Sequence, residues 1–524
     1  MATYIETAKA IVKSYIKSAI FIDENALEPY QKPHTPIVSE EALSVSLHKE
    51  FRQNNISLST YRYRHKTYKK NKTYLLGGRD LILLDWKLNG NEGEDYALEI
   101  LNDVVSANYH IPFCVVYTSE RQTGNVFNNI LSFFSGVTQE DSDNIKLSLL
   151  LEDEDNGPDF LRQLSDIVHN GNYSDNIINA FKNQFQNIFE NEYFNTERQD
   201  IQSRLLNCWC AYNPFCKAAS TNKAHISSYN SNTPLLIINE TFILILNKQE
   251  TTASLLQERY SEIISNYENG FSQLLKLELS SLIKNKGFSI NAEMSYIKKD
   301  TYAYHKKQNK EEFENFIKSI ILDGISVNLL DSPLTTVVSL NTDIEIAVPS
   351  SEELIRMNTF YNSIYRQGEK KLTFGDVFQL YNENGATDFY YVCINPLCDC
   401  SFPKNENTFY FAQGKKINLQ EQNKELTRSE EIFISYIPGD TMIRWAEIQK
   451  GKPTYITPIP LTVPKFDIKD NIIYAYQLQA KISKKRKYQL HYITTLKQNY
   501  AQRIANHAFT HSTRVGISYI KKDN

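Results

Sequence analysis

The sequence predicts a multi-domain α/β plus α+β protein whose first domain is a doubly wound parallel sheet. Helical and strand-like patterns alternate over roughly residues 1–155, which is the order that a parallel sheet with helices on its faces requires. From about residue 371 the pattern changes to short β-type segments separated by Gly, Pro and Asn. The length of 524 residues also indicates several domains, because a single hydrophobic core stops growing at about 250–300 residues.

The elements of the first domain follow from the spacing of apolar residues. Between residues 4 and 16 these recur every three or four positions, which predicts an amphipathic helix. Residues 39–53 and 93–107 also show helical patterns. Strands are expected in four segments: 19–22, 55–63, 80–85 and 111–117. Ligand sites in such sheets lie outside the carboxyl ends of the strands, so the residues that follow these segments are the candidates for a site.

The rest of the chain divides into four further segments. Residues 156–330 are mainly helical and contain a hairpin at 233–248, with its turn at Asn239 and Glu240. Residues 331–370 form a linker and a helix. Residues 371–480 form a β-rich module, either a small barrel or an open sheet. Residues 481–524 begin with a basic run and are expected to form a long C-terminal helix up to about His511, which packs on another domain or on a second subunit.

Composition excludes several classes of protein. The net charge is −4, so the chain as a whole has no electrostatic attraction to nucleic acid or to an anionic membrane. No apolar run is long enough to span a bilayer, and the N-terminus lacks the apolar core of a signal peptide. We therefore expect a cytoplasmic protein with no membrane partner and with reduced cysteines. P-loop, dinucleotide-binding, zinc-protease and nucleophile-elbow motifs are absent from the sequence.

Acidic and hydroxyl side chains follow three of the expected strands: Asp23 and Glu24, Asp85, and Thr118. Carboxylates that lie close together repel one another, and a shared Mg²⁺ would remove that repulsion. An aspartate can attack a phosphoryl group, and a nearby hydroxyl can bind the new phosphate and move with it. A single acid at a strand end is more often a solvated residue or a helix cap. The four residues together, in this order, favour a site.

Three segments resemble response-regulator receiver domains, the CheY-like superfamily with a flavodoxin-like sheet. The run from Asp80 to Gly93 is similar to their third strand and the loop after it. Residues 111–118 are similar to the fourth strand, and residues 19–24 to the first strand with its acidic pair. The resemblance covers roughly residues 18–152. It implies that Asp85 is the phosphoacceptor, that Thr118 is the switch hydroxyl, and that a histidine kinase is the partner. It also implies a Mg²⁺ site formed by Asp23, Glu24 and Asp85.

The chain also departs from the receiver pattern. Receivers carry a Lys at the end of the fifth strand to pair with the phosphoryl group. The fifth strand is expected here at residues 145–151, which end in Glu152 and Asp153, with Lys146 at the opposite end. Asn89 replaces the usual Pro, and Ser119 replaces the usual Ala or Gly. Two alternatives follow: the domain senses phosphorylation at Asp85, or it is a degenerate receiver that docks a protein partner.

The layout of the whole chain is similar to receiver-fronted proteins of bacterial conflict and anti-phage systems. In those proteins a divergent receiver is joined to further regions and is paired with an ATPase of the GHKL type, the class of histidine kinases and Hsp90. The similarity rests on short segments, among them 235–248, 373–378, 393–400 and 513–516. It implies an ATPase partner and a role in anti-phage defence. We accordingly expect a regulatory protein and not an enzyme.

Two other functions compete with this interpretation. Cys393, Cys398 and Cys400 lie close together in the sequence and form a candidate thiol or metal cluster, which would make residues 371–480 an enzyme effector. Cys208, Cys210 and Cys216 form a second group, and the alternative for both groups is buried, reduced cysteine. The basic run Lys484 to Lys487 could instead bind phosphates of a nucleic acid through the C-terminal helix.

Overall fold

The structure is a computed structural model of the chain. It describes residues 4–509 except for the following segments and single positions: 29–38, 89–92, 107–110, 121, 153, 172, 174, 195–200, 214–223, 225, 231–233, 252–254, 267–269, 285–295, 309–312, 331, 341–347, 367–369, 384, 397–406, 419–420, 422–425, 427–432, 450–451 and 479–484. The chain separates into two compact units, Met1–Asn341 and Thr342–Asn524, and each is described by itself.

The first unit is built on a seven-stranded sheet with the strand order β2-β1-β3-β4-β7-β6-β5. The first five strands in this order run parallel, and β6 and β5 are antiparallel additions at one edge. The strands are β1 (Ser18–Asp23), β2 (Ser57–Arg62), β3 (Leu81–Leu84), β4 (Phe113–Thr118), β5 (Ile226–Asn230), β6 (Leu235–Ile238) and β7 (Thr241–Asn247). The expected parallel sheet is confirmed, and so is the hairpin at 233–248.

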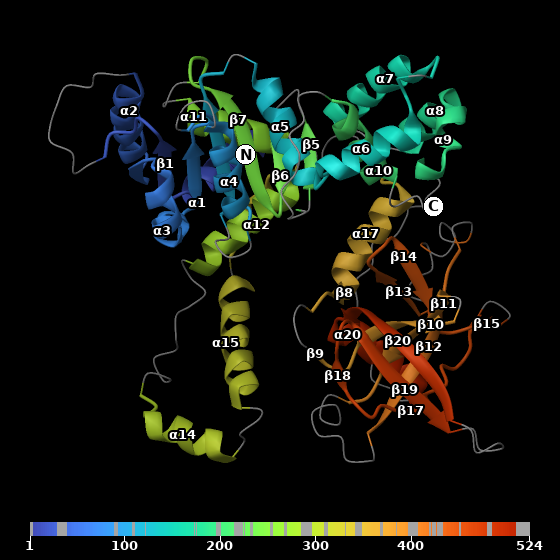
Figure 1. The fold of residues 1–524 in the computed structure, drawn as a ribbon. Coiled ribbons are helices and arrows are strands. Elements are labelled where there is room, and N and C mark those ends of the chain that lie inside the picture. The colour runs from blue at the N-terminus through green and yellow to red at the C-terminus, as the bar shows by residue number, and fades with distance from the viewer. Residues whose placement is uncertain are drawn as a thin grey trace. The chain divides into compact units, whose positions relative to one another are not determined.

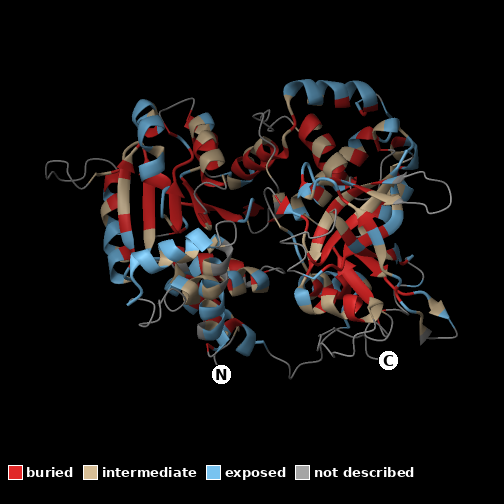
Figure 2. Ribbon diagram, turned by 90° about the horizontal axis from the view of Figure 1, so that it is seen from below, coloured by how far each residue is buried: buried red, intermediate tan, exposed pale blue. Residues whose placement is uncertain are grey.

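Helices cover both faces of this sheet (Figure 1). One face packs against α1 (Tyr4–Tyr15), α2 (Ser39–Gln53), α11 (Leu256–Asn266) and α12 (Gly270–Leu282). The other packs against α3 (His65–Leu76), α4 (Gly93–Val104) and α5 (Thr123–Ser135). Successive residues of a strand point to opposite faces, so Phe21 joins the first core and Ile22 the second. Both are fully buried, which explains why the central strands are continuous apolar runs (Figure 2).

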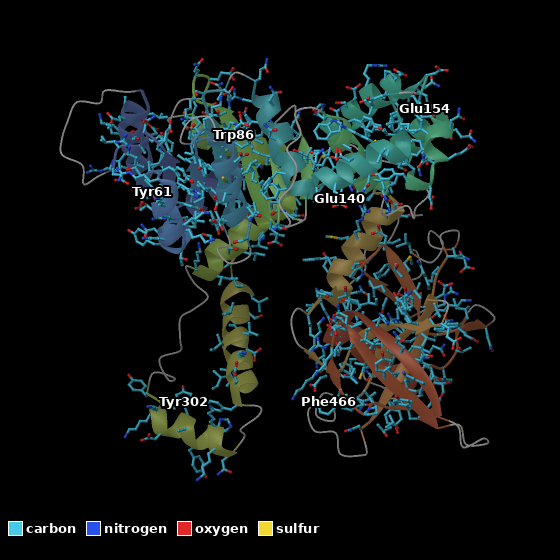
Figure 3. All side chains as sticks on the ribbon, in the orientation of Figure 1. Tyr61, Trp86, Glu140, Glu154, Tyr302 and Phe466 are labelled. Atoms are coloured by element: carbon cyan, nitrogen blue, oxygen red, sulfur yellow. The ribbon has the colours of Figure 1, made fainter. Side chains whose placement is uncertain are left out.

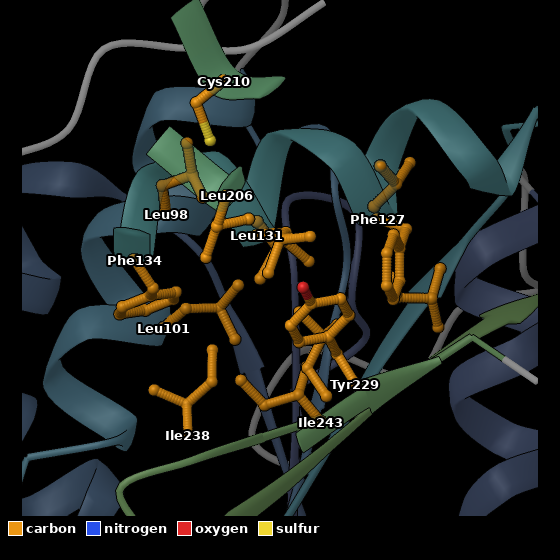
Figure 4. Packing of buried hydrophobic residues seen from close by; sticks show 14 of the residues in the cluster. Leu98, Leu101, Phe127, Leu131, Phe134, Leu206, Cys210, Tyr229, Ile238 and Ile243 are labelled. Atoms are coloured by element: carbon orange, nitrogen blue, oxygen red, sulfur yellow. The ribbon is translucent and has the colours of Figure 1, made fainter. Parts of the chain in front are cut away.

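A mainly helical segment, residues 119–240, separates the fourth and fifth parallel strands and also contains β5 and β6. It contains α5, α6 (Gln139–Leu149), α7 (Gly157–Asn170), α8 (Asp175–Gln184), α9 (Gln186–Phe189), a 3₁₀ turn at Glu192–Phe194 and α10 (Ile201–Tyr212). This segment shares one core with the sheet, because Leu131 of α5 and Leu206 of α10 point toward Ile243 of β7 (Figure 4). The expectation of mainly helical structure after residue 156 is confirmed.

The strand expected at residues 145–151 is wrong, because this segment lies mostly in α6. A capping box starts that helix: the Thr138 hydroxyl accepts from the backbone of Asp141, and the Asp141 carboxylate accepts from the backbone of Thr138. Ile145 and Leu149 are buried at helical spacing, and Leu147 is 72% exposed. The fifth parallel strand is instead β7, which pairs with β4 over six residues.

The remaining helices of the first unit are α14 (Lys299–Gln308), α15 (Phe313–Leu330) and α16 (Thr335–Val338). Glu278 of α12 fixes the start of α16, because its carboxylate accepts from the backbone N–H groups of Thr335 and Thr336 at 2.6 and 2.9 Å. The end of this unit is thereby tied back to the helices that cover the sheet. No helix within the described ranges is long and apolar enough to cross a membrane.

The second unit is an antiparallel barrel with helices α17 (Ser351–Asn362) and α20 (Gln498–Ala508). Its main sheet has the order β11-β10-β20-β19-β17-β12-β14-β13, and β11 also pairs with β12, which closes six of the strands into a ring. The strands are β10 (Asp376–Asn382), β11 (Gly385–Cys393), β12 (Thr408–Lys416), β13 (Ile434–Ile437), β14 (Thr441–Arg444), β17 (Ile459–Thr462), β19 (Ile472–Leu478) and β20 (Lys485–Leu496). Short strands complete the unit: β8 (Ser363–Ile364), β9 (Lys370–Lys371), β15 (Ile448–Gln449), β16 (Lys452–Pro453) and β18 (Asp467–Ile468).

The β-rich module with a terminal helix is confirmed, but the basic run was placed in the wrong element. Residues 485–496 form strand β20, and the helix begins only at Gln498. The strand alternates buried Tyr488, Leu490 and Tyr492 with more exposed polar residues. This period of two is the pattern of a half-buried strand. The helix was predicted to include these residues because apolar residues after Leu496 recur at helical spacing.

Candidate functional site

Two aspartates lie side by side at the carboxyl edge of the parallel sheet. Asp23 ends β1, and Asp85 follows β3, whose residues pair with β1 up to Ile22 and Leu84. The backbone N–H of Asp85 donates to the carbonyl of Ile22 at 2.9 Å. Asp23 is fully buried and Asp85 is 8% exposed. The local fold therefore brings two carboxylates out of water together, at the edge where the sequence predicted a site.

The cation that compensates these carboxylates is Lys248, the first residue after β7. Its Nζ donates to Asp23 Oδ2 at 2.9 Å and to Asp85 Oδ1 at 2.7 Å. The lysine side chain is only 10% exposed. Its backbone N–H donates to the carbonyl of Thr118 at 2.7 Å, which continues the ladder between β4 and β7. The receiver pattern places a Lys at the end of the fifth strand, and the structure has one there, about a hundred residues beyond the segment in which it was sought.

Burial and charge act in opposite directions on these groups. Burial, with a contribution from the neighbouring Asp23, raises the pKa of Asp85 to about 7, although Lys248 acts to lower it. For Lys248, burial acts to lower the pKa, but the two carboxylates outweigh it, so the pKa is raised and the ammonium stays charged. Near neutral pH the site therefore holds a permanent cation and a carboxyl group that can change its charge.

The hydroxyl of Thr118 lies at the end of β4, between β3 and β7, and is 1% exposed. Its Oγ1 accepts from the backbone N–H of Glu120 at 3.1 Å. Asn247 holds the same loop, because its Nδ2 donates to the carbonyl of Glu120 at 2.8 Å while its Oδ1 accepts from the N–H of Gln249 at 2.7 Å. The loop after Thr118 and the residue before Lys248 are thus directly joined.

Other residues of the loops after β1, β3 and β4 lie near the two aspartates. Lys87 forms an ion pair with Glu120, which connects the loop after β3 to the loop after β4. Glu24 is half-buried beside Asp23, and its carbonyl accepts from Arg62 Nε at 3.0 Å. Ser119 is exposed. Trp86, which follows Asp85 and is labelled in Figure 3, is buried and donates a backbone hydrogen bond to the Asp85 carboxylate.

The predicted Mg²⁺ site can be tested against this arrangement. Among the described residues no cluster of three or more His, Cys, Asp or Glu side chains is arranged to hold a metal ion. Asp23 and Asp85 do supply two hard oxygen ligands that already share one cation, Lys248. Mg²⁺ typically binds through one or two carboxylates and keeps several waters, so these two residues fit it, and the role of Glu24 stays a prediction.

Lys248 is the functional residue that sequence reasoning missed. Its signal was present, because an apolar run of five residues, Phe242 to Leu246, is followed by Asn247 and Lys248. That run was predicted to form a hairpin outside the first domain, and the fifth strand was predicted at residues 145–151. Only the pairing of β4 with β7 shows which of the two segments completes the sheet.

The competing sites fall elsewhere. Cys393 is fully buried in β11, and Cys398 and Cys400 lie outside the described residues. Cys208 and Cys210 are buried in α10, and Cys216 lies outside the described residues. Burial raises the pKa of the Cys208 thiol well above its usual range, so this thiol is not a ready nucleophile. Lys485, Arg486 and Lys487 belong to β20, and Lys484 is outside the described residues.

Comparison with known proteins identifies the fold of the first unit. Residues 15–165 match the family model described as a response receiver domain. No curated protein and no solved structure matches the chain. The matched segment contains Asp23, Asp85 and Thr118 and ends within α7, so it does not include β7 or Lys248. The N-terminal part of this chain is a receiver domain, and a receiver domain indicates a signalling or regulatory role.

Proposed function

We propose that this protein is a phosphorylation-controlled regulator in which Asp85 accepts the phosphoryl group. The observation that carries the proposal is the contact of Lys248 with both Asp23 and Asp85. It supplies the cation that the receiver pattern requires, in the position that the pattern requires. Phosphoryl transfer depends on positive charge placed where negative charge gathers on the phosphoryl oxygens, and Lys248 lies against the proposed acceptor.

The chemistry follows from the groups at this edge of the sheet. An ionised Asp85 oxygen attacks the phosphorus of a phosphodonor, the bond from phosphorus to the donor's leaving group breaks, and an acyl phosphate forms on Asp85. Lys248 neutralises negative charge that gathers on the phosphoryl oxygens. Thr118 can donate its hydroxyl proton to the product. When bound by Asp23 and Asp85, Mg²⁺ supplies further positive charge at the same place.

Asp85 must be ionised to act as a nucleophile. Because its pKa is raised to about 7, part of the population is protonated at neutral pH, and a bound cation would favour the ionised form. We therefore expect the rate of phosphorylation to rise with pH between about 6 and 8, and the rise to shift to lower pH when the Mg²⁺ concentration is increased. The observed rate with a small phosphodonor, measured across this range, tests the expectation.

The deciding experiment treats the full chain with acetyl phosphate and Mg²⁺ and locates the modification by mass spectrometry and Phos-tag gels. Beryllofluoride binding serves as a non-covalent check. We expect modification of Asp85, its loss in Asp85→Asn, and at least a hundredfold slower reaction in Lys248→Met. Asp80→Asn is the matched control, because Asp80 lies at the opposite edge of the sheet, where it accepts from the backbone N–H groups of Lys17 and Ser18.

A wild-type chain that is neither modified nor binds beryllofluoride would overturn the phosphorylation proposal. It would favour the alternative, a degenerate receiver that docks a protein partner. In either case we propose that the partner is a histidine kinase or another GHKL-type ATPase, and that the setting is bacterial anti-phage defence. Co-purification of such an ATPase with the full chain is the result that the partner proposal requires. Loss of phage resistance in an Asp85→Ala strain is the result that the phosphorylation version requires.

A further inference from the structure

A long acid-free segment stands out in the second unit. From residue 471 to residue 522 the sequence contains ten Lys and Arg residues and no Asp or Glu, although the whole chain has a net charge of −4. The segment includes β19, β20 and α20. Three of these cations, Lys485, Arg486 and Lys487, belong to β20, so positive potential is concentrated on that strand.

Strand β20 lies between β10 and β19, and its alternation decides which residues face outward. Tyr488, Leu490 and Tyr492 are buried, whereas Lys487 is exposed and Gln489 and His491 are half-buried. The outward residues are therefore every second residue of β20. Register extends this face over both neighbours: Gln489 is opposite Tyr381 of β10 and Tyr474 of β19, and Lys487 is opposite Tyr476.

The planar and cationic groups on this face contact one another across the strands. The rings of Tyr381 and His491 stack with centroids 3.7 Å apart and planes at 18°. Lys487 Nζ lies 4.3 Å from the ring centroid of Tyr474, which is 43% exposed. The Nε2 atoms of Gln489 and His491 are 3.0 Å apart. Burial lowers the pKa of His491, so at neutral pH it is a neutral, planar group. We call the residues Tyr381, Tyr474, Tyr476, Lys487, Gln489 and His491 the β20 face.

We propose that the β20 face binds single-stranded nucleic acid. Bases stack on exposed aromatic rings in a way that does not depend on sequence, and lysines beside those rings contact the phosphates. The β20 face offers both groups on one face of the barrel wall. The sequence of β20 begins with Lys485, Arg486 and Lys487. The proposal is independent of the chemistry at Asp85, because the two surfaces belong to different units.

The distribution of charge indicates where the phosphates and the bases of a bound strand would lie. The acids near this face, Glu383, Asp388 and Asp470, all lie outside β19 and β20. Asp388 acts electrostatically on Tyr390 of β11, on the far side of β10. Phosphates would therefore follow β20, which carries Lys487, and bases would stack on Tyr474 and on the Tyr381–His491 pair. A purely acidic protein partner would need the lysines but not the rings, so removing a ring separates the two cases.

The test measures fluorescence anisotropy of the full chain with labelled oligo(dT) and oligo(U) of about 16 nucleotides and with a duplex of the same length. We expect the single strands to bind, and binding to weaken steeply between about 50 and about 200 mM salt. Tyr474→Ala should weaken binding by about tenfold or more, since one stacked base contributes about 1–3 kcal/mol. Lys487→Gln should reduce the salt slope by about one. A preference for dT or for U would tell whether DNA or RNA is the ligand.

Matched controls come from the other basic surface of the chain, helix α3. Tyr74 is 79% exposed there, and Lys70 is exposed on the same helix. Tyr74→Ala and Lys70→Gln should leave binding unchanged. All variants should show the wild-type unfolding transition, followed by Trp86 and Trp209 for the first unit and by Trp445 for the second. The proposal fails if no single strand binds at about 50 mM salt. It also fails if Tyr474→Ala has no effect, or if the α3 variants weaken binding as much as the β20 variants do.

Discussion

Each unit of the protein buries an aspartate against a cation, and the two pairs differ in how fully the carboxylate is hydrogen-bonded. In the second unit, Asp376 is fully buried and accepts from Arg366 Nη2 with both oxygens, at 2.7 and 2.6 Å. Thr495 Oγ1 and the backbone N–H of Thr373 donate to it as well, at 2.7 and 2.8 Å. All four acceptor positions of the carboxylate are therefore used inside the protein.

In the first unit, the carboxylate of Asp85 accepts from Lys248 and from the backbone of Trp86. Lys248 is shared with Asp23, so two negative charges depend on one positive charge. Burial raises the pKa of both Asp85 and Asp376, to about 7 and about 6. The pKa alone therefore does not separate a reactive group from a structural one. The two aspartates differ instead in spare acceptor capacity and in position, because Asp85 lies at the carboxyl edge of a parallel sheet.

The largest expected effect comes from removing the shared cation. Lys248→Met leaves two buried carboxylates without a counter-charge, so we expect the free energy of unfolding of the first unit to fall by about 3–5 kcal/mol at pH 8. At pH 5 the loss should be much smaller, because Asp85 then takes up a proton. Urea unfolding followed by Trp86 and Trp209 measures this at both pH values. Lys248→Arg, which keeps the charge, should lose less at either pH.

The structural pair gives the next largest effect. Asp376→Ala leaves the Arg366 guanidinium, the Thr495 hydroxyl and the Thr373 N–H without their acceptor. Because Arg366 is 29% exposed and can be partly hydrated, we expect a loss of about 2–3 kcal/mol in the second unit, followed by Trp445 fluorescence. Asp376→Asn should also destabilise, since its amide NH₂ cannot accept from the donors around it. An Asp376→Asn variant as stable as the wild type would contradict the distinction between the two pairs.

The Asp85→Asn substitution should have the opposite effect and increase the free energy of unfolding. The folded-state pKa of Asp85 is raised from 3.8 to about 7, so the wild type has its full stability below about pH 4 and loses part of it as the pH rises to about 7. The variant has no carboxyl group to ionise at this position, so it does not lose this stability as the pH rises. We expect it to be more stable than the wild type at pH 8 by about 1 kcal/mol or more, and the difference to shrink toward pH 5. Urea unfolding at the two pH values measures it, and a difference that does not depend on pH would show that Asp85 does not titrate in this range.

The smallest effect is expected at the surface pair beside the site. Lys87 and Glu120 are 56% and 36% exposed, so water screens their attraction. Lys87→Gln should change the free energy of unfolding by less than about 1 kcal/mol, and the change should vanish at high salt. Thermal unfolding at low and high salt tests this. A loss comparable to that of Lys248→Met would show that the charge balance of the site extends to its rim.

Local patterns predicted most of the fold and half of the site. The apolar runs that end in Asp23, Asp85 and Thr118 identify the central strands, because a strand buried on both faces has no polar positions to interrupt it. Their alternation with helices predicts that they are parallel, and parallel strands bring their carboxyl ends to one edge. The receiver domain and the placement of its acids therefore follow from short stretches of sequence, taken together and in their order along the chain.

The partner of β4 was decided only by tertiary structure. Residues 145–151 and 241–247 are both short apolar segments, but the first is capped as a helix by Thr138 and Asp141, whereas the second pairs with β4 over six residues. Strand pairing joins residues far apart in the chain, and nothing within a segment states which neighbour it will meet. The sequence by itself determined which acids lie at the edge of the sheet. The fold decided that Lys248, beyond a mainly helical segment, provides their common counter-charge.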